Sequence, residues 1–260
     1  MRGIEYIEGF FPEDIVAFTT SRVGGFSNNF YSSFNLGLHV GDSQENVKKN
    51  QLLLTNLLEK NLVWMYQKHT NSVQQVGSFS KTVEADGIIT IEYNCGCAVL
   101  TADCLPILLS TGDGRVIGAL HVGWRGLSSG ILENFYSKVI YSHFYHKNNC
   151  PLINSIYIWF GPSICRLCFE VGFDVKVRFL NFSSQIDKYF ELKSENRWYC
   201  DLKEIALVKT RKFFEKKVNY TYEIRIDDRC TFKNQKLFFS FRRDGITGRM
   251  ASIISRRINL

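Results

Sequence analysis

Residues 95–127, CGCAVLTADCLPILLSTGDGRVIGALHVGWRGL, carry the clearest structural signals in the chain. Two short apolar runs, residues 98–110 and the run that ends at His121, flank the turn-forming residues 111–115. Short runs that are rich in Val, Ile and Leu and bounded by turn signals are typical of buried strands rather than helices. The pair Asp103-Cys104 interrupts the first run, although a buried strand has no structural need for it. This pair is therefore the first candidate for chemistry.

The turn between the two runs predicts a hairpin register. Gly112-Asp113 is an acceptable two-residue loop, because Gly and Asp tolerate the positive φ angles of such turns. With that loop Cys104 lies opposite His121, and cross-strand partners have Cβ atoms about 4.5–5.5 Å apart. A thiol and an imidazole at that separation can share a metal ion or a proton. A slip of one residue would send them to opposite faces, and Pro106 favours an edge or a bulge.

Length and composition bound the class of protein. The 260 residues favour a single domain over residues 1–260, and 45% hydrophobic residues are enough for a substantial core. No apolar run approaches the roughly 18 residues of a membrane span, and acidic residues stand where a signal peptide needs an apolar stretch. We therefore expect a cytoplasmic protein with no membrane partner. Its eight Cys are then expected to be thiols, metal ligands or catalysts rather than disulfides.

The formal net charge of +7 suits anionic ligands. Lys and Arg are spread along the chain, so we expect no nucleic-acid partner and favour a phosphate-bearing small molecule, with a plain solvated surface as the alternative. A planar guanidinium group binds oxyanions well. The candidate phosphate ligands are Arg22, beside a glycine pair, and Arg243 and Arg249 in the arginine-rich stretch 240–249. Residues 123–126, GWRG, also resemble a strand-to-helix turn of the kind that binds anions.

Periodicity and capping residues predict the remaining elements. Helical spacing of apolar residues predicts helices over residues 42–61, 127–142 and 201–215. An apolar helix is expected after residue 249. Residues 154–160, 220–226 and 236–241 are predicted to be strands.

The histidines are few and differ in setting. His69 follows an apolar strand and begins a polar run; alone, it is more typical of a structural or exposed histidine than of a ligand. His143 and His146 lie in a polar segment and are predicted to be surface residues.

Two cysteine pairs resemble parts of a metal motif. Cys165-x-x-Cys168 has the spacing of a zinc knuckle, and Cys95-x-Cys97 could complete a site. One CxxC and one CxC do not make a full motif, so we do not predict a structural zinc ion.

A series of short blocks in the chain resembles a known family. The blocks are TSRVGG at 20–25, NLG at 35–37, VGD at 40–42, QKH at 67–69, TADC at 101–104, HVGWRG at 121–126, GPSI at 161–164, FEVG at 169–172, FRRDG at 241–245 and GR at 248–249. In this order they resemble the YfiH-type family, whose members are named multicopper polyphenol oxidase, laccase-like protein or purine nucleoside phosphorylase. Lys68 departs from the family pattern, which has an apolar residue there, and so does Phe241, where Tyr is usual.

The resemblance implies an α/β (α+β) architecture of mixed β-sheets flanked by helices, arranged as a layered sandwich. It implies a metal and catalytic trio of His69, Cys104 and His121, which agrees with the predicted hairpin. The implied activities are phosphorolysis of adenosine, inosine and S-methyl-5′-thioadenosine, and metal-dependent deamination of adenosine. The substrates are then purine nucleosides and phosphate. Zinc is the expected cofactor, with copper as the alternative.

Residue chemistry separates the implied activities. A multicopper oxidase needs a His-rich copper cluster, and the chain has only five His; any oxidase activity would rest on a single copper ion. A His₂Cys zinc site with an open position is a catalytic pattern, and deamination would use Asp103 or Asp86 to relay protons. Phosphorolysis needs an anion site and a group that protonates the leaving base, a role open to Cys104 or a histidine.

A rival function of another mechanistic class is a Cys-His hydrolase. Cys104 would be the nucleophile and His121 or His69 the base, acting on an amide or ester, which suits the peptidoglycan-editing label of some family members. A non-enzymatic metal-binding role is a further alternative, and so is a buried Cys with two core histidines. We predict a zinc-dependent purine nucleoside phosphorylase with adenosine deaminase activity.

Overall fold

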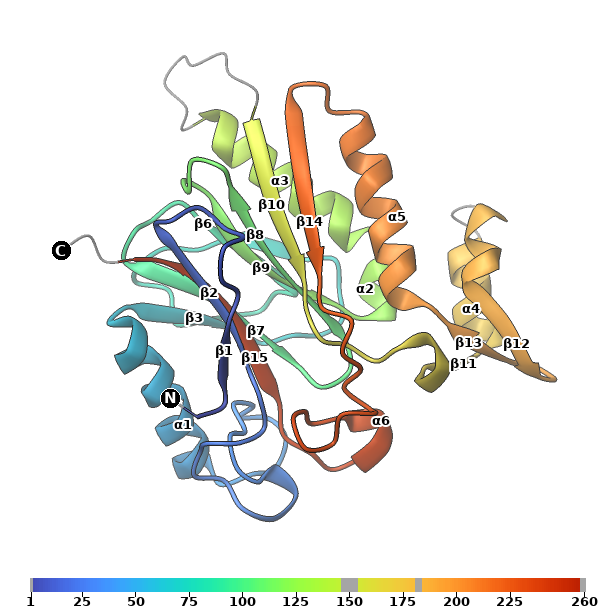
Figure 1. The fold of residues 1–260 in the computed structure, drawn as a ribbon, viewed down its shortest axis with the longest axis horizontal. Helices are drawn as coiled ribbons and strands as arrows, with labels where there is room; N and C mark the ends of the chain where they lie inside the picture. The colour runs from blue at the N-terminus through green and yellow to red at the C-terminus, as the bar shows by residue number, and fades with distance from the viewer. Residues whose placement is uncertain (1, 146–153, 181–183, 258–260) are drawn as a thin grey trace.

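The computed structural model describes residues 2–145, 154–180 and 184–257, which form a layered α/β sandwich (Figure 1). Two mixed sheets stack on each other at its centre. Helix α1 (Gln44–Leu58) covers the outer face of the first sheet. Helices α3 (Ile131–Tyr145) and α5 (Leu202–Glu215) cover the outer face of the second. The predicted architecture of mixed sheets flanked by helices is therefore confirmed.

The first sheet joins strands from both ends of the chain. Its described strands follow the order β1-β2-β15-β7-β3-β5. Strand β15 pairs antiparallel with β2 and β7, and β3 runs parallel to β7. The strands are β1 (Ile4–Tyr6), β2 (Ile15–Thr20), β3 (Asn61–Met65), β5 (Thr82–Val83), β7 (Cys95–Thr101) and β15 (Met250–Arg256).

The second sheet contains the central hairpin. Its described strands follow the order β14-β10-β8-β9-β6-β4. They are β4 (Val73–Gln75), β6 (Gly87–Thr90), β8 (Leu105–Thr111), β9 (Ile117–Val122), β10 (Asn154–Phe160) and β14 (Tyr220–Ile226). The strands predicted over residues 154–160 and 220–226 are confirmed as β10 and β14.

A smaller sheet stands to one side of the sandwich (Figure 1). It has the order β11-β13-β12 and packs with short helices. Its strands are β11 (Glu170–Gly172), β12 (Phe190–Ser194) and β13 (Arg197–Cys200). The remaining helical segments are α2 (Trp124–Ser128), α4 (Phe173–Leu180) and α6 (Phe241–Asp244), with short 3₁₀ helices η1 (Asn29–Tyr31), η2 (Arg166–Cys168) and η3 (Ser184–Tyr189). Within the described ranges, no helix is both long and apolar enough to cross a bilayer.

Buried side chains fill the spaces between the layers. Val63, Cys97 and Val99 of the first sheet meet Leu108 and Ala119 of the second in one cluster. A larger cluster joins the other face of the second sheet to α3 and α5. Since both faces of the central strands are buried, β7, β8 and β9 carry nearly continuous apolar runs. The stacking also brings the ends of strands from both sheets together. The candidate functional site lies at these strand ends.

The hairpin register differs from the predicted one by two residues. Pro106, not Cys104, lies opposite His121, because Thr111 hydrogen-bonds to Val116 and closes a longer loop than predicted. The direct pairing of Cys104 with His121 was therefore wrong. A shift of two residues keeps side chains on the same face of a strand, so the thiol and the imidazole still point to the same side.

The end of the chain was also predicted wrongly. The expected C-terminal helix is strand β15, whose sequence MASIISR is too short an apolar run for its pattern to separate helix from strand. Pairing with β2 on one side and β7 on the other decides the outcome. The expected strand 236–241 is absent from the described structure, because Phe238 and Phe239 instead pack in a small cluster with Met250.

Helix boundaries shift by small amounts. Helix α1 begins after its N-cap Ser43 and stops at Glu59, which takes a left-handed conformation, so Asn61 already belongs to β3. The predicted turn at residues 123–126 is the first turn of α2, with Gly123 as its N-cap. Helix α5 begins as predicted, because Asp201 accepts a hydrogen bond from the backbone of Glu204.

Candidate catalytic and metal centre

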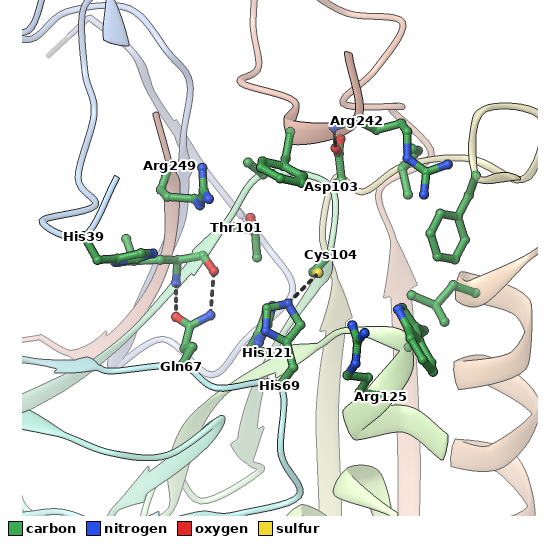
Figure 2. Close-up of a pocket in the computed structure, with 17 residues that line it drawn as sticks. His39, Gln67, His69, Thr101, Asp103, Cys104, His121, Arg125, Arg242 and Arg249 are labelled. Atoms are coloured by element: carbon green, nitrogen blue, oxygen red, sulfur yellow. Dashed lines mark hydrogen bonds between the residues drawn. The ribbon is translucent and has the colours of Figure 1, made fainter. Parts of the chain in front are cut away.

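The three side chains of the predicted trio come from different parts of the sandwich and meet at one point (Figure 2). Cys104 ends the short link that carries the chain from β7 of the first sheet to β8 of the second. His121 lies on β9, next to β8, and His69 lies in the loop after β3. The structure therefore brings one sulfur and two imidazole rings together.

The distances within the trio fit a tetrahedral ion. Sγ of Cys104 lies 3.8 Å from Nε2 of His69, and the rings of His69 and His121 meet edge to face with centroids 4.7 Å apart. One ligand atom from each residue lies within 4.8 Å of the other two. Ordinary Zn–S and Zn–N bonds separate sulfur from nitrogen by roughly 3.5 Å. The donor set therefore fits a His₂Cys ion with a fourth position toward the cavity.

A buried carboxylate, Asp86, holds two members of the trio. Its Oδ1 accepts a hydrogen bond from Nδ1 of His121 at 2.8 Å. The same carboxylate accepts hydrogen bonds from the backbone N–H groups of Lys68, His69 and Thr70 and from the Thr70 hydroxyl, at 2.7–3.2 Å. Because Nδ1 of His121 is engaged, the ring presents Nε2 to the other two side chains.

Two backbone features make room for the trio. His69 has a φ angle of 59°, in the left-handed region that residues other than glycine rarely adopt. The hydrogen bonds to Asp86 hold it there. A Cβ added at Gly123 would lie 2.7 Å from Cδ2 of His69 and 3.3 Å from Sγ of Cys104. Glycine at this position therefore leaves the space that the ring and the thiol occupy.

The electrostatics favour a charged pair in the metal-free protein. Desolvation raises the pKa of Cys104, but His121 and His69 outweigh it and lower the pKa to about 6. Desolvation lowers the pKa of His121, but the thiolate and Asp86 raise it to about 9. Burial also raises the pKa of Asp86, yet hydrogen bonds from His121 and Thr70 lower it to about 2. Both shifts favour a thiolate beside an imidazolium in the metal-free centre.

This charge state predicts unusual reactivity of Cys104. In metal-free protein, alkylation of Cys104 by iodoacetamide should follow a pH midpoint of about 6, whereas an ordinary thiol has a midpoint of about 8.5. The sign follows from the lowered pKa: the reactive thiolate persists as pH falls from 8 to 6. Peptide mass spectrometry after timed alkylation measures the rate at Cys104 separately from the other thiols. A midpoint above pH 8 would contradict the charged pair.

A cavity of about 400 Å³ opens over the trio. Three guanidinium groups line it, those of Arg125, Arg242 and Arg249, and none forms a salt bridge among the described residues. Figure 2 shows Arg249 with His39 on one side of the trio and Arg125 with Arg242 on the other. The other lining residues are mainly apolar or aromatic: Leu100, Ala102, Trp124, Ile164, Phe169, Leu202 and Phe241.

Two of the three predicted phosphate ligands lie away from the cavity lining. Arg22 donates to the carbonyls of Ser32 and Gln235. Arg243 donates to three backbone carbonyls and pairs with Asp244 at 2.7 Å. Both guanidinium groups are thus engaged in holding loops, and of the predicted three only Arg249 reaches the cavity. Arg125 and Arg242 lie in blocks that the sequence had singled out, but nothing in the sequence marked their side chains as facing the cavity.

His39 and Gln67 line the cavity and were not predicted. Although His39 is exposed to the cavity, desolvation and the positive charges of Arg249 and His121 lower its pKa. The amide of Gln67 accepts from the backbone N–H of Leu100 and donates to the carbonyl of Leu100 (Figure 2). His39 lies in a loop between two family blocks, so only its position beside those blocks could have marked it.

The two family departures have clear structural settings. Lys68 is exposed and forms a salt bridge with Glu84 at 2.7 Å, so its side chain does not enter the cavity. Phe241 does line the cavity, where the guanidinium group of Arg249 lies 5.9 Å from its ring centroid. A phenyl ring therefore stands in the cavity wall at the position where the resemblance implies a tyrosine hydroxyl.

The prediction that His143 is a surface residue was wrong. His143 is buried on α3, and its Nε2 lies 2.9 Å from Oδ2 of Asp113 in the hairpin loop. His146 falls outside the described residues. Cys95 and Cys97 lie buried on β7 and do not join Cys165 and Cys168, which cluster instead with Cys230.

Comparison with known proteins shows the family of the chain. The model of the family described as multi-copper polyphenol oxidoreductase laccase matches residues 16–257. A purine nucleoside phosphorylase of Haemophilus influenzae is 38% identical over 94% of this chain and 95% of its own length. The purine nucleoside phosphorylase YfiH of Escherichia coli K12 is 34% identical over 94% of each chain.

Solved structures share the whole fold. Protein NMB0706 of Neisseria meningitidis superposes with a TM-score of 0.86 at 30% identity, covering 99% of this chain and 100% of that one. YlmD of Geobacillus stearothermophilus superposes with a TM-score of 0.84 at 28% identity, covering 99% and 97%. The chain therefore belongs to the YfiH-type family, the family described as multi-copper polyphenol oxidoreductase laccase.

Proposed function

We propose that this chain is a purine nucleoside phosphorylase acting on adenosine, inosine and S-methyl-5′-thioadenosine. The products are the free base and the 1-phosphate of ribose or of methylthioribose. The observation that carries the proposal is the set of three guanidinium groups, without carboxylate partners among the described residues, around the cavity above the trio. Such a set suits a phosphate co-substrate, and relatives named purine nucleoside phosphorylase support it.

Arg249 is the main phosphate ligand in this proposal. Its Nη1 donates to the carbonyls of Thr247 and Gly248, both at 3.0 Å, which fixes the guanidinium group in place. The remaining N–H groups are left for an oxyanion. His39 lies beside Arg249 (Figure 2), and its lowered pKa makes it a neutral donor for a phosphate or ribose oxygen.

The opposite side of the cavity suits the purine base. Trp124 and Phe169 line it, and the guanidinium groups of Arg125 and Arg242 lie over these rings, 4.2 and 5.3 Å from the ring centroids. A flat base can stack on such planar groups. Arg125 and Arg242 add positive charge there. When a phosphate oxygen bonds to C1′, the glycosidic bond breaks and its electron pair leaves with the base. The two guanidinium groups would stabilise this developing negative charge, and the departing base takes up the proton that hydrogen phosphate loses.

The trio lies between these two sides. His69, Cys104 and His121 would hold the metal ion, for which we propose zinc, with copper as the alternative. When bound, zinc supplies a Lewis acid that withdraws electron density from the substrate. Asp86 keeps the His121 ring and the backbone of His69 in position. The link through Cys104 is held by Asp103, which accepts hydrogen bonds from Thr231 and from the backbone N–H of Arg242.

Deamination of adenosine is a second proposed activity with less support from the geometry. It needs a carboxylate that relays protons. Asp103 accepts hydrogen bonds from Thr231 and the Arg242 backbone at 2.6 and 2.7 Å. Asp86 accepts hydrogen bonds from His121 and from the backbone of His69, so both carboxylates are already engaged. Among the described residues that line the cavity, no other carboxylate is present. The geometry therefore favours phosphorolysis over deamination.

A Cys-His hydrolase is the alternative function that one observation favours. Asp86, His121 and Cys104 follow the order of a carboxylate–imidazole–thiol triad. In metal-free protein this arrangement would attack an amide or ester, as a peptidoglycan-editing enzyme does. A further candidate function, that of a single-copper polyphenol oxidase, is supported only by the description of the family.

Product analysis of the purified protein tests the proposal. Adenosine is incubated with and without phosphate, and with and without a chelator, and the products are separated by chromatography. Phosphorolysis gives adenine and ribose 1-phosphate only when phosphate is present. Inosine formation without phosphate reports deamination. Hydrolysis of ester or amide substrates that survives the chelator but not iodoacetamide would favour the hydrolase.

Arg249→Ala should weaken phosphate use selectively. Loss of a charge-assisted, two-pronged contact costs about 1.5–3 kcal/mol, so KM for phosphate should rise by about 10- to 100-fold. Arg211, an exposed residue of α5, provides the matched control, and Arg211→Ala should leave the phosphate KM unchanged. Steady-state rates at varied phosphate measure both. An unchanged phosphate KM in Arg249→Ala would remove Arg249 from the anion site.

A further inference from the structure

A second group of sulfur atoms lies outside the catalytic centre. Cys165 is the N-cap of the turn η2 and Cys168 is its last residue, and Cys230 approaches them from a segment more than sixty residues away in the sequence. One sulfur from each residue lies within 4.8 Å of the other two. The three residues are free cysteines, and only Cys230 is fully buried. Three thiols thus converge at a site that is partly open to solvent, because Cys165 and Cys168 are only half-buried.

The spacing within the cluster suits a shared ion better than a disulfide. Sγ of Cys165 lies 3.6 Å from Sγ of Cys168. Two sulfurs bound to one tetrahedral zinc, with Zn–S bonds of about 2.3 Å, are separated by roughly 3.8 Å. A disulfide requires about 2.05 Å. The observed separation is therefore close to the edge of a metal–thiolate tetrahedron.

Burial and the two neighbouring cysteines raise the pKa of Cys168 to about 12 in the metal-free protein, so a negatively charged cluster needs donors around it. The backbone N–H of Cys165 lies 3.3 Å from Sγ of Cys230, and the backbone N–H groups of Phe232 and Lys233 also hydrogen-bond to that sulfur. Lys203 lies close enough to Cys230 to interact with it electrostatically. The site therefore offers both N–H donors and positive charge to a negatively charged cluster.

We propose that Cys165, Cys168 and Cys230 form a second metal site, which binds a thiophilic d¹⁰ cation, zinc or copper(I). The three sulfurs supply three ligands, and solvent supplies the fourth for zinc. Soft thiolate ligands select these ions over magnesium, calcium or manganese. The site is separate from the His₂Cys centre and does not rest on the proposed catalytic function.

The position of the cluster gives the ion a structural role. Segment 163–169 carries Ile164 and Phe169 of the cavity wall, and Thr231, next to Cys230, donates to Asp103 at 2.6 Å. A metal at the cluster would therefore join the two segments that hold the cavity wall and the link beside Cys104. Its contribution should appear as stability, because binding to the folded state alone stabilises that state.

Metal stoichiometry of purified variants tests the site. The full chain is prepared under reducing conditions, loaded with zinc alone or with copper(I) alone, desalted and analysed by mass spectrometry of metals. In the Cys104→Ala background, which removes one ligand of the first centre, we expect about one equivalent of metal to remain. Adding Cys168→Ser should remove it and lower Tm in the metal-loaded protein only. Cobalt(II) loading should give intense thiolate charge-transfer absorption that Cys168→Ser abolishes.

Cys200→Ala is the matched control, since it removes a buried thiol outside the cluster. It should leave the one equivalent of metal bound. Cys165→Ser serves as an independent second variant, because Cys165 is half-buried and its replacement spares the buried Cys230. If the Cys104→Ala protein binds no metal tightly, or if Cys165→Ser and Cys168→Ser both bind as much as their background, the proposed site does not exist. Recovery of a Cys165–Cys168 disulfide in place of metal, under reducing preparation, would equally overturn it.

Discussion

Asp86→Asn is expected to lower kcat/KM by about 100-fold while the protein stays folded. Asparagine keeps the shape of the side chain and an acceptor for part of the 68–70 backbone. It cannot accept from every donor that the carboxylate now serves, and its NH₂ group opposes Nδ1–H of His121. The imidazole then loses the tautomer and orientation that present Nε2 to Cys104. Steady-state kinetics, with metal content measured in parallel, tests this expectation.

Asp113→Asn is the matched control for that result. Asp113 also pairs with a buried imidazole, that of His143, at 2.9 Å, but it lies in the hairpin loop and does not line the cavity. Its replacement should lower stability and leave kcat/KM nearly unchanged. If Asp86→Asn retains wild-type activity, or if Asp113→Asn loses as much activity as Asp86→Asn, the positioning role of Asp86 fails.

Cys104→Ala should reduce phosphorolysis by about 1,000-fold or more, because the residues of such a centre act as a unit. The sulfur is the shared neighbour of both rings: it lies 3.8 Å from Nε2 of His69, and it raises the pKa of His121. Without it the His₂Cys donor set is incomplete, and metal content should fall. Rates of adenine release and metal content of the same samples measure both effects.

Cys97→Ala is the control for loss of a buried thiol, since Cys97 lies in the core between the sheets. It should lower Tm through a small cavity and keep activity per folded molecule. Wild-type activity in Cys104→Ala would show that the chemistry takes place elsewhere.

The layered fold and the candidate trio could be predicted from the sequence more accurately than the hairpin register that positions Cys104 relative to His121. The pattern of 95–127 predicted strands in this stretch, but the first run, 98–110, is two strands, β7 of the first sheet and β8 of the second, broken at Asp103-Cys104. Nor could the pattern show that Thr111 and Val116 close a longer loop. Cys104 and His121 still point to the same side, because side chains on a strand alternate with a period of two and the register shift is two residues. An odd shift would have separated them. The C-terminal strand could not be told from a helix, because its neighbours β2 and β7 decide its structure from outside.

Long-range contacts explain the other errors. A guanidinium group is visible in the sequence, but the carbonyls that occupy Arg22 and Arg243 are not. Likewise, the third member of the sulfur cluster, Cys230, is too distant in the sequence for a spacing rule to associate it with Cys165 and Cys168. His143 was misplaced because its partner, Asp113, lies on a turn thirty residues earlier. In each case the deciding partner comes from another layer or loop.

Anomalous diffraction from crystals of the zinc-loaded protein, recorded at the zinc absorption edge, tests the central claim most directly. We predict a peak bonded to Nε2 of His69, Sγ of Cys104 and Nε2 of His121, at about 2.0–2.1 Å from each nitrogen and about 2.3 Å from the sulfur. A crystal loaded with excess zinc that shows no peak among these three atoms, with the thiol turned away from both rings, would contradict the assignment of this centre.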